Sequence, residues 1–171
     1  PDIITASNVF AHADDLKAIT RNVFSLLKQG GCFIIEVQYL VDTIKTLTFD
    51  NIYHEHVNYW SVTTLNSFFQ RLGYSMFHVE HIDTHGGSIR CYISDVGVHN
   101  IDKSVGEFLE QERELRIDNY GTYKHRFADQ ISRLKDIVRT NIKLLNGKFD
   151  KVVAYGSPAK ATTALNYFEI T

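Results

Sequence analysis

The first 37 residues alternate between strand-like and helix-like patterns, and this order restricts the fold more than any other feature of the chain. Residues 2–10 have the pattern of a short buried strand that ends in a polar turn. The acidic pair Asp14-Asp15 then precedes a helix whose apolar positions recur every three or four residues: Leu16, Ile19, Val23, Leu26 and Leu27. Gly30-Gly31 ends this helix, and residues 32–37 form a second strand. Such a sequence predicts a βαβ unit with parallel strands and hence an α/β fold.

The middle of the chain combines one irregular stretch with a second group of regular elements. Residues 38–60 follow neither the helical nor the strand period, and many of them are polar or aromatic. A helical pattern follows over residues 61–73. Two strand patterns, residues 74–82 and 89–95, are joined by a Gly-Gly turn and predict a hairpin.

From residue 104 onwards the chain has a different character. Residues 104–118 and 120–147 show helical periodicity with charged residues on the opposite face, which predicts a helical connector. Residues 151–155 are apolar and strand-like, and residues 161–168 follow as a helix after a glycine turn. Strand, glycine turn and helix in this order are typical of the opening of another α/β domain.

Charge and composition exclude several classes of protein. There are 18 basic and 20 acidic residues, and this near balance argues against a nucleic-acid binder with a broad basic face. No apolar run approaches the ~20 residues of a membrane helix, and no signal peptide is visible. Cys32 and Cys91 lie in apolar runs and are expected to be buried thiols of a cytoplasmic protein. The first residue is Pro1 and a strand pattern begins at once, so we expect a fragment or a trimmed chain.

The densest group of proton-active residues is Tyr53-His54-Glu55-His56, after the second strand. Loops beyond the carboxyl ends of parallel strands carry the ligand sites of such sheets. Histidine can move a proton near neutral pH, a carboxylate can orient it, and a tyrosine hydroxyl can stabilise an enolate oxygen. The alternative is an ordinary polar turn with one histidine in the core. A metal site is disfavoured, because the histidines are two residues apart and not four.

Three further segments are candidates, each with a plain structural alternative. His12 follows the first strand and either faces the same crevice or begins the helix. His85-Gly86-Gly87-Ser88 is either a simple hairpin turn or a place where the backbone closely approaches a ligand. Residues 156–160 combine a glycine turn, a helix start and Lys160, which could bind an anion, although the spacing is not that of a P-loop.

Four motifs in this order resemble the S-adenosylmethionine-dependent sugar C-methyltransferases, which act on nucleotide-linked 4-keto-deoxysugars. The motifs are Asn8-Val9-Phe10-Ala11-His12, Tyr53-His54-Glu55-His56, His85-Gly86-Gly87-Ser88-Ile89-Arg90 and Tyr155-Gly156-Ser157-Pro158-Ala159-Lys160. The resemblance implies that residues 1–98 are the C-terminal part of a class I methyltransferase domain with a Rossmann-like sheet. Residues 99–147 would be a helical connector, and residues 148–171 the first strand-helix unit of a C-terminal Rossmann-like domain. Zinc would belong only to an N-terminal module whose cysteines this sequence lacks.

The resemblance also implies roles for individual residues. His56 would be the general base that removes the proton at sugar carbon 3, and the resulting enolate would accept the methyl group of S-adenosylmethionine. Tyr53, Glu55 and His12 would orient the base and the sugar or stabilise the oxyanion. Asn8 and Val9 would lie near the cofactor methyl. The residues that border the pocket for the nucleotide-diphosphate ketosugar would be His85, Gly86, Gly87, Ser88, Tyr155, Gly156 and Lys160.

Other functions fit the same residues less well but remain open at this stage. An oxygen- or nitrogen-methyltransferase would use the same fold and would also need a base. A non-catalytic binding or scaffold module, which the fragment itself could be, would need none of the proton chemistry. A metal hydrolase is the last alternative.

Overall fold

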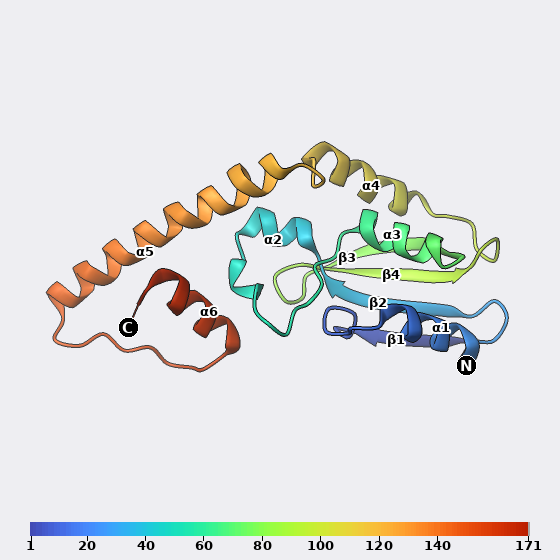
Figure 1. The fold of residues 1–171 in the computed structure, drawn as a ribbon, viewed down its shortest axis with the longest axis horizontal. Helices are drawn as coiled ribbons and strands as arrows, with labels where there is room; N and C mark the ends of the chain where they lie inside the picture. Colours follow the sequence, from blue (N-terminus) through green and yellow to red (C-terminus); the bar gives the residue numbers. More distant parts are fainter. Residues whose placement is uncertain (171) are drawn as a thin grey trace.

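A computed structural model describes residues 1–170, and its centre is one four-stranded sheet (Figure 1). The strands are β1 (Ile3–Ser7), β2 (Cys32–Gln38), β3 (Tyr74–Ile82) and β4 (Ser88–Asp95), in the spatial order β1-β2-β4-β3. β1 and β2 are parallel, and β4 is antiparallel to both β2 and β3. The predicted strand-helix-strand unit, the hairpin and the α/β class are therefore confirmed.

The hydrophobic core lies on one face of this sheet. Alternate residues of β2 are buried, as its pleat requires: Phe33, Ile35 and Val37. Helices α1 (Leu16–Leu26) and α3 (Val62–Arg71) pack their apolar residues against this face. Phe10 is fully buried and contacts both Phe33 and Phe69, with ring centroids 5.8 and 6.0 Å away. The chain segment after β1 is thus anchored in the core immediately before His12.

Residues 38–60 contain two short helices that the sequence pattern did not reveal. These are α2 (Leu40–Thr46) and the 3₁₀ helix η1 (Phe49–Asn51). Seven residues are too few to display a helical period, and an isolated helix of this length is unstable in water. Tertiary burial stabilises α2 instead, since Val41, Thr43 and Ile44 are buried.

The helical connector consists of α4 (Lys103–Leu115), a π-helical segment η2 (Thr122–Ala128) and α5 (Asp129–Lys148). It is attached to the sheet domain by Glu112, which is completely buried. The Glu112 carboxylate accepts hydrogen bonds from the backbone N–H groups of Val62 and Thr63, at 2.6 and 2.8 Å, and from the Thr63 hydroxyl at 2.5 Å. A negative charge at a helix N-terminus also interacts favourably with the helix dipole. Glu112 therefore fixes α4 to the start of α3.

The strand predicted at residues 151–155 is not formed. This segment is extended but unpaired, and its side chains are exposed, including those of Val153 and Tyr155. A strand needs a neighbour for its backbone N–H and C=O groups, and none of β1–β4 runs beside it. The predicted helix after the glycine turn is confirmed as α6 (Ala159–Phe168), whereas residue 171, the end of the predicted unit, lies outside the described residues.

Helix α6 folds back against α5 and η1. Phe168 is buried with Phe49 and Ile131 in a small second core. Beyond the helix, the Glu169 carboxylate pairs with Lys135 and Arg139 of α5. These contacts bring the first turn of α6 close to the irregular stretch between β2 and α3, as Figure 1 shows.

The two cysteines lie in β2 and β4. Both cysteines are free thiols; Cys91 is fully buried and Cys32 is partly buried, and burial raises the pKa of both. In the part of the chain that the structure describes, no helix combines the length and the apolar character that crossing a membrane requires.

The attachment by Glu112 can be tested through stability. Glu112→Ala leaves the buried N–H of Val62 and the partly buried N–H of Thr63 without their acceptor, so we expect the free energy of unfolding to fall by about 3 kcal/mol. The matched control is Glu114→Ala on the exposed side of the same helix, which should change it by less than about 0.5 kcal/mol. Urea denaturation measures both, and equal effects of the two substitutions would contradict the proposed attachment.

Candidate active site

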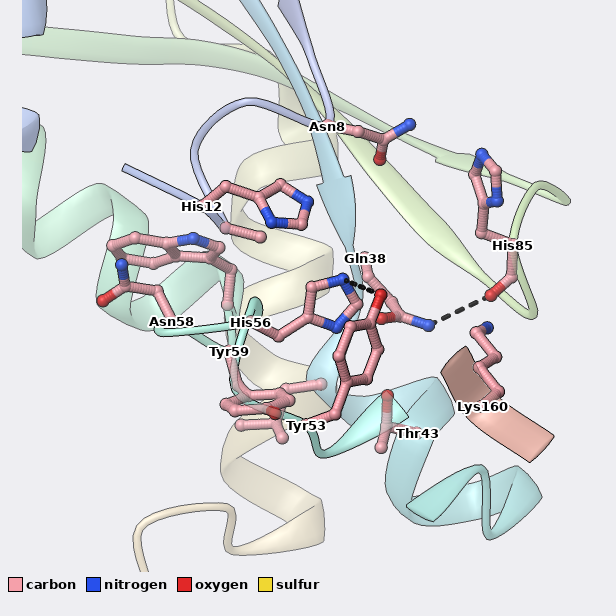
Figure 2. Close-up of a pocket in the computed structure, with 13 residues that line it drawn as sticks. Asn8, His12, Gln38, Thr43, Tyr53, His56, Asn58, Tyr59, His85 and Lys160 are labelled. Carbon is pink, nitrogen blue, oxygen red and sulfur yellow. Dashed lines mark hydrogen bonds between the residues drawn. The ribbon is translucent and has the colours of Figure 1, made fainter. Parts of the chain in front are cut away.

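A cavity of about 210 Å³ lies at the carboxyl ends of β1 and β2 (Figure 2). Six of the residues predicted from the sequence line it: Asn8, His12, Tyr53, His56, His85 and Lys160. They come from four separate segments, namely the turn after β1, the stretch between η1 and α3, the β3–β4 turn and the first turn of α6. The fold therefore brings six of the thirteen predicted residues into one cavity, where the topology of a parallel pair predicts a ligand site.

The hydrogen bonds of His56 determine which of its ring nitrogens faces the cavity. Its Nδ1 lies 2.8 Å from the backbone carbonyl oxygen of Asn51. A carbonyl can only accept a hydrogen bond, so Nδ1 carries the proton and the Nε2 of the uncharged ring keeps its lone pair as an acceptor. The hydroxyl of Tyr53 lies 3.3 Å from this Nε2 and is placed to donate to it. His56 is thus set to act as a base through Nε2.

His12 is held in the same way next to His56. Its Nδ1 lies 2.8 Å from the backbone carbonyl oxygen of Glu55, so its Nε2 is also the unprotonated nitrogen of the uncharged ring. The rings of His12 and His56 are neighbours, with centroids 4.9 Å apart. In addition, the carbonyl of Ala11 accepts from the N–H groups of Val57 and Asn58. The turn after β1 and the Tyr53–Tyr59 segment therefore form one hydrogen-bonded unit.

Glu55 contributes its backbone to this unit and not its carboxylate. The side chain of Glu55 is exposed and does not line the cavity, and the same holds for His54. Across the residues that the structure describes, no group of three or more His, Cys, Asp or Glu side chains is arranged to hold a metal ion. The chemistry that the cavity offers is proton transfer and hydrogen bonding by imidazole, phenol and amide groups.

Asn51 and Trp60 contribute buried polar groups at the base of the site. The Asn51 carbonyl, which accepts from His56, also accepts from the Tyr59 hydroxyl at 3.3 Å, and burial raises the pKa of Tyr59. Within residues 1–170, the Trp60 indole N–H is buried without a hydrogen-bond partner, although Trp60 lines the cavity.

The turn between β3 and β4 borders the cavity through His85. His85 has a left-handed backbone with φ 53°, and its carbonyl accepts from the Gln38 side chain at 3.0 Å, as Figure 2 shows. Gly87 closely approaches the Asp42 side chain of α2: a Cβ on Gly87 would lie 2.2 Å from Asp42 Oδ2. Gly86, Gly87 and Ser88 do not line the cavity. The close backbone approach that the glycines allow is therefore directed at α2, which places His85 at the rim.

Some predicted residues lie outside the cavity, and some lining residues had not been predicted. Val9 is exposed beside Asn8, while Tyr155 and Gly156 are exposed on the extended segment before α6. Gln38 and Thr43 line the cavity although their roles were not predicted from the sequence. Gln38 carried a usable signal, since it is a polar residue at the carboxyl end of a parallel strand; Thr43 carried none, because α2 was not recognised.

Comparison with known proteins gives a consistent result for the whole chain. Residues 1–79 match the family model described as "Methyltransferase domain", and residues 83–171 match "C-methyltransferase C-terminal domain". The chain is 32% identical over 164 residues to C-methyltransferase NovU of Streptomyces niveus. The aligned residues make up 95% of this chain and 39% of that protein. The two family matches meet within the β3–β4 hairpin, so the sheet joins residues of both.

The close approach of Gly87 to Asp42 predicts an unusual sensitivity to substitution. Gly87→Ala should lower the free energy of unfolding by about 3 kcal/mol, because it adds a steric overlap to a left-handed backbone with φ 112°. Rotation of the carboxyl group would not relieve it, since the Asp42 Cβ would be 2.6 Å away. Gly97→Ala is the control, with φ 83° and no atom within 4 Å, and should cost only about 1 kcal/mol. Similar losses in chemical denaturation would refute the contact.

Proposed function

Because this chain belongs to the C-methyltransferase family, as its motifs predicted, we propose that the protein is an S-adenosylmethionine-dependent C-methyltransferase. We further propose that it acts at carbon 3 of a nucleotide-linked 4-keto-deoxysugar. The methyltransferase match over residues 1–79 agrees with a Rossmann-like class I fold for the sheet. The chain spans 39% of the length of the relative NovU, so the activity is proposed for the full-length protein.

The lone pair on His56 Nε2 is the observation that carries this proposal. A proton next to a ketone is weakly acidic, so its removal needs a base of near-neutral pKa and donors that stabilise the enolate oxygen. Each such donor typically contributes ~2.7–4 kcal/mol to the transition state. His56 supplies the base; once its Nε2 is protonated, the Tyr53 hydroxyl can no longer donate to it and becomes the nearest candidate donor to the enolate oxygen. When His56 takes up the proton, its Nδ1–H keeps the bond to the Asn51 carbonyl, which also stabilises the imidazolium.

His12 and Glu55 support the base indirectly. The Glu55 carbonyl fixes the His12 ring, and the two imidazoles are neighbours. His12 therefore lies where it can accept a hydrogen bond from a sugar hydroxyl and hold the sugar against His56. Glu55 is a positioning residue in this mechanism, and it acts through its backbone.

The cofactor residues implied by the family are Asn8 and Val9. Asn8 lines the cavity with a left-handed backbone, φ 56°, and its N–H donates to the Glu36 carbonyl of β2 at 2.9 Å. This turn leaves Val9 exposed, so an amide and an apolar side chain stand together at the end of β1 and fit the polar and apolar parts of S-adenosylmethionine. When bound, the cofactor supplies the methyl group that the carbon nucleophile accepts.

Lys160 and His85 support an anionic, sugar-linked substrate. Both line the cavity at its outer side, and Lys160 provides a positive charge for the diphosphate of a nucleotide sugar. Gly86, Gly87 and Ser88 form the turn that carries His85, and Tyr155 and Gly156 precede the helix that carries Lys160. We assign these residues to the border of the substrate pocket. The free thiols support a cytoplasmic location.

Hydrogen exchange at carbon 3 tests the proposal directly. The full-length protein should wash the carbon-3 hydrogen of a 4-keto nucleotide sugar into deuterated water, and His56→Ala should slow this by about 10²–10⁴-fold. His54→Ala is the matched control, because His54 is exposed and lies outside the cavity. Proton NMR of the sugar measures the exchange rate. A wild-type rate in His56→Ala would show that His56 is not the base.

A further inference from the structure

A cavity of about 230 Å³ lies on a different side of α2 from the candidate active site. Leu40 and Thr43 of α2 line the candidate active site. Val41, Ile44 and Lys45 of the same helix line the other cavity. Its remaining walls come from Leu115, Ile117, Thr122 and Arg126. This α2–η2 cavity and the candidate active site share no lining residue.

The walls of the α2–η2 cavity are mainly apolar. Val41 and Ile44 are buried, and Leu115 and Ile117 are half-buried on the side of the connector. The Thr122 hydroxyl is directed at two carbonyl oxygens at the end of α4, at 3.1 and 2.8 Å. Its hydrogen is therefore already used within the protein. The walls can bury the apolar body of a ligand, but they provide no free hydroxyl donor for it.

Two positively charged side chains complete the lining, Lys45 from α2 and Arg126 from η2. Both residues are exposed, and neither forms an ion pair within residues 1–170. The carboxylates nearest to them in the sequence, Asp42 and Asp129, pair with histidines at 2.7 and 2.9 Å. Two like charges beside one apolar cavity attract an anion, and the planar guanidinium fits a carboxylate with two parallel hydrogen bonds.

The segment that carries Arg126 is π-helical. At its end, the Asp129 N–H donates to the Lys124 carbonyl, five positions earlier, and η2 comprises seven residues. Segments with this hydrogen-bond pattern are rare and are frequently found at functional sites. The conformation of η2 is therefore an indication of a ligand site that is independent of the charges.

We propose that the α2–η2 cavity binds a small aromatic monocarboxylate. The ring lies against the apolar walls, and the carboxylate pairs with Arg126 and Lys45. The volume supports a single ring, because a cavity of about 150 Å³ accepts benzene and the remaining space admits one carboxyl group. The proposal is independent of the proposed methyl transfer, since none of the residues assigned to proton transfer lines this cavity.

Three probes separate the contributions of the ring and of the charge. The dissociation constants of benzoate, benzamide and acetate are measured by ligand-observed NMR titration of the full-length protein. Benzoate should bind at least about ten-fold more tightly than benzamide, which lacks the charge, and than acetate, which lacks the ring. Arg126→Ala and Lys45→Ala should each weaken benzoate binding about ten-fold. Lys124→Ala is the matched control, because Lys124 is exposed on η2 and does not line the cavity; it should change nothing.

The same titrations can overturn the proposal in three ways. The first is benzoate binding that is no tighter than benzamide binding, and the second is equal benzoate affinity in Arg126→Ala and Lys124→Ala. The third is a loss in Lys160→Ala with none in Arg126→Ala, which would place benzoate in the candidate active site. Ile117→Phe adds volume to the half-buried wall and should abolish benzoate binding. Wild-type affinity in this variant would likewise refute the position of the ring.

Discussion

The backbone pairing between Tyr39 and Trp60 is the constraint on which the candidate active site depends. The two residues form a parallel bridge beyond the end of β2, and the Leu40 N–H donates to the Trp60 carbonyl at 2.8 Å. This pairing closes the loop that carries α2, η1 and the Tyr53–Tyr59 segment. Loop closure costs conformational entropy, which burial of Tyr39 and Trp60 and the capping of the following helix offset. Without it, the segment that carries His56 would be held at the sheet chiefly by its hydrogen bonds to Ala11 and His12.

Backbone carbonyls, and not carboxylates, orient the two imidazoles. Residues in fixed turns provide both acceptors, Asn51 for His56 and Glu55 for His12. A backbone acceptor carries no charge that titrates, so the tautomer of each ring follows from the fold alone. The unprotonated nitrogen of each ring is therefore Nε2, and both rings line the cavity. The remaining walls of this cavity come from distant parts of the chain.

The helical connector determines where α6 and Lys160 lie relative to the candidate active site. Glu112 fixes α4 to α3, and α5 then runs back so that α6 can dock on η1. Lys160 therefore reaches a cavity built mostly from the first 85 residues. The same docking creates a second cavity beside Phe49 and Tyr167. Helix α6 therefore contributes residues to both cavities.

The sequence alone predicted the elements whose pattern is local. The helix from Leu16, the hairpin and the long connector helices each show their own period, and His12 and His56 stand out because they follow strands. Helix α2 was missed because tertiary burial, which no local pattern reports, stabilises it. The strand at residues 151–155 was wrong because β-propensity cannot supply a pairing partner. Gly87 was considered either part of a simple hairpin turn or a point of close approach to a ligand, whereas it approaches Asp42, which is 45 positions away in the sequence.

The central claim is that the fold makes His56 Nε2 the unprotonated, basic nitrogen of the ring. Nitrogen-15 NMR of the full-length protein labelled at histidine reports it most directly, with the His56 signals assigned by their loss in His56→Ala. Above the pH at which the ring titrates, the account predicts a protonated, pyrrole-type Nδ1 and an unprotonated, pyridine-type Nε2. The opposite tautomer, with the proton on Nε2, would contradict it.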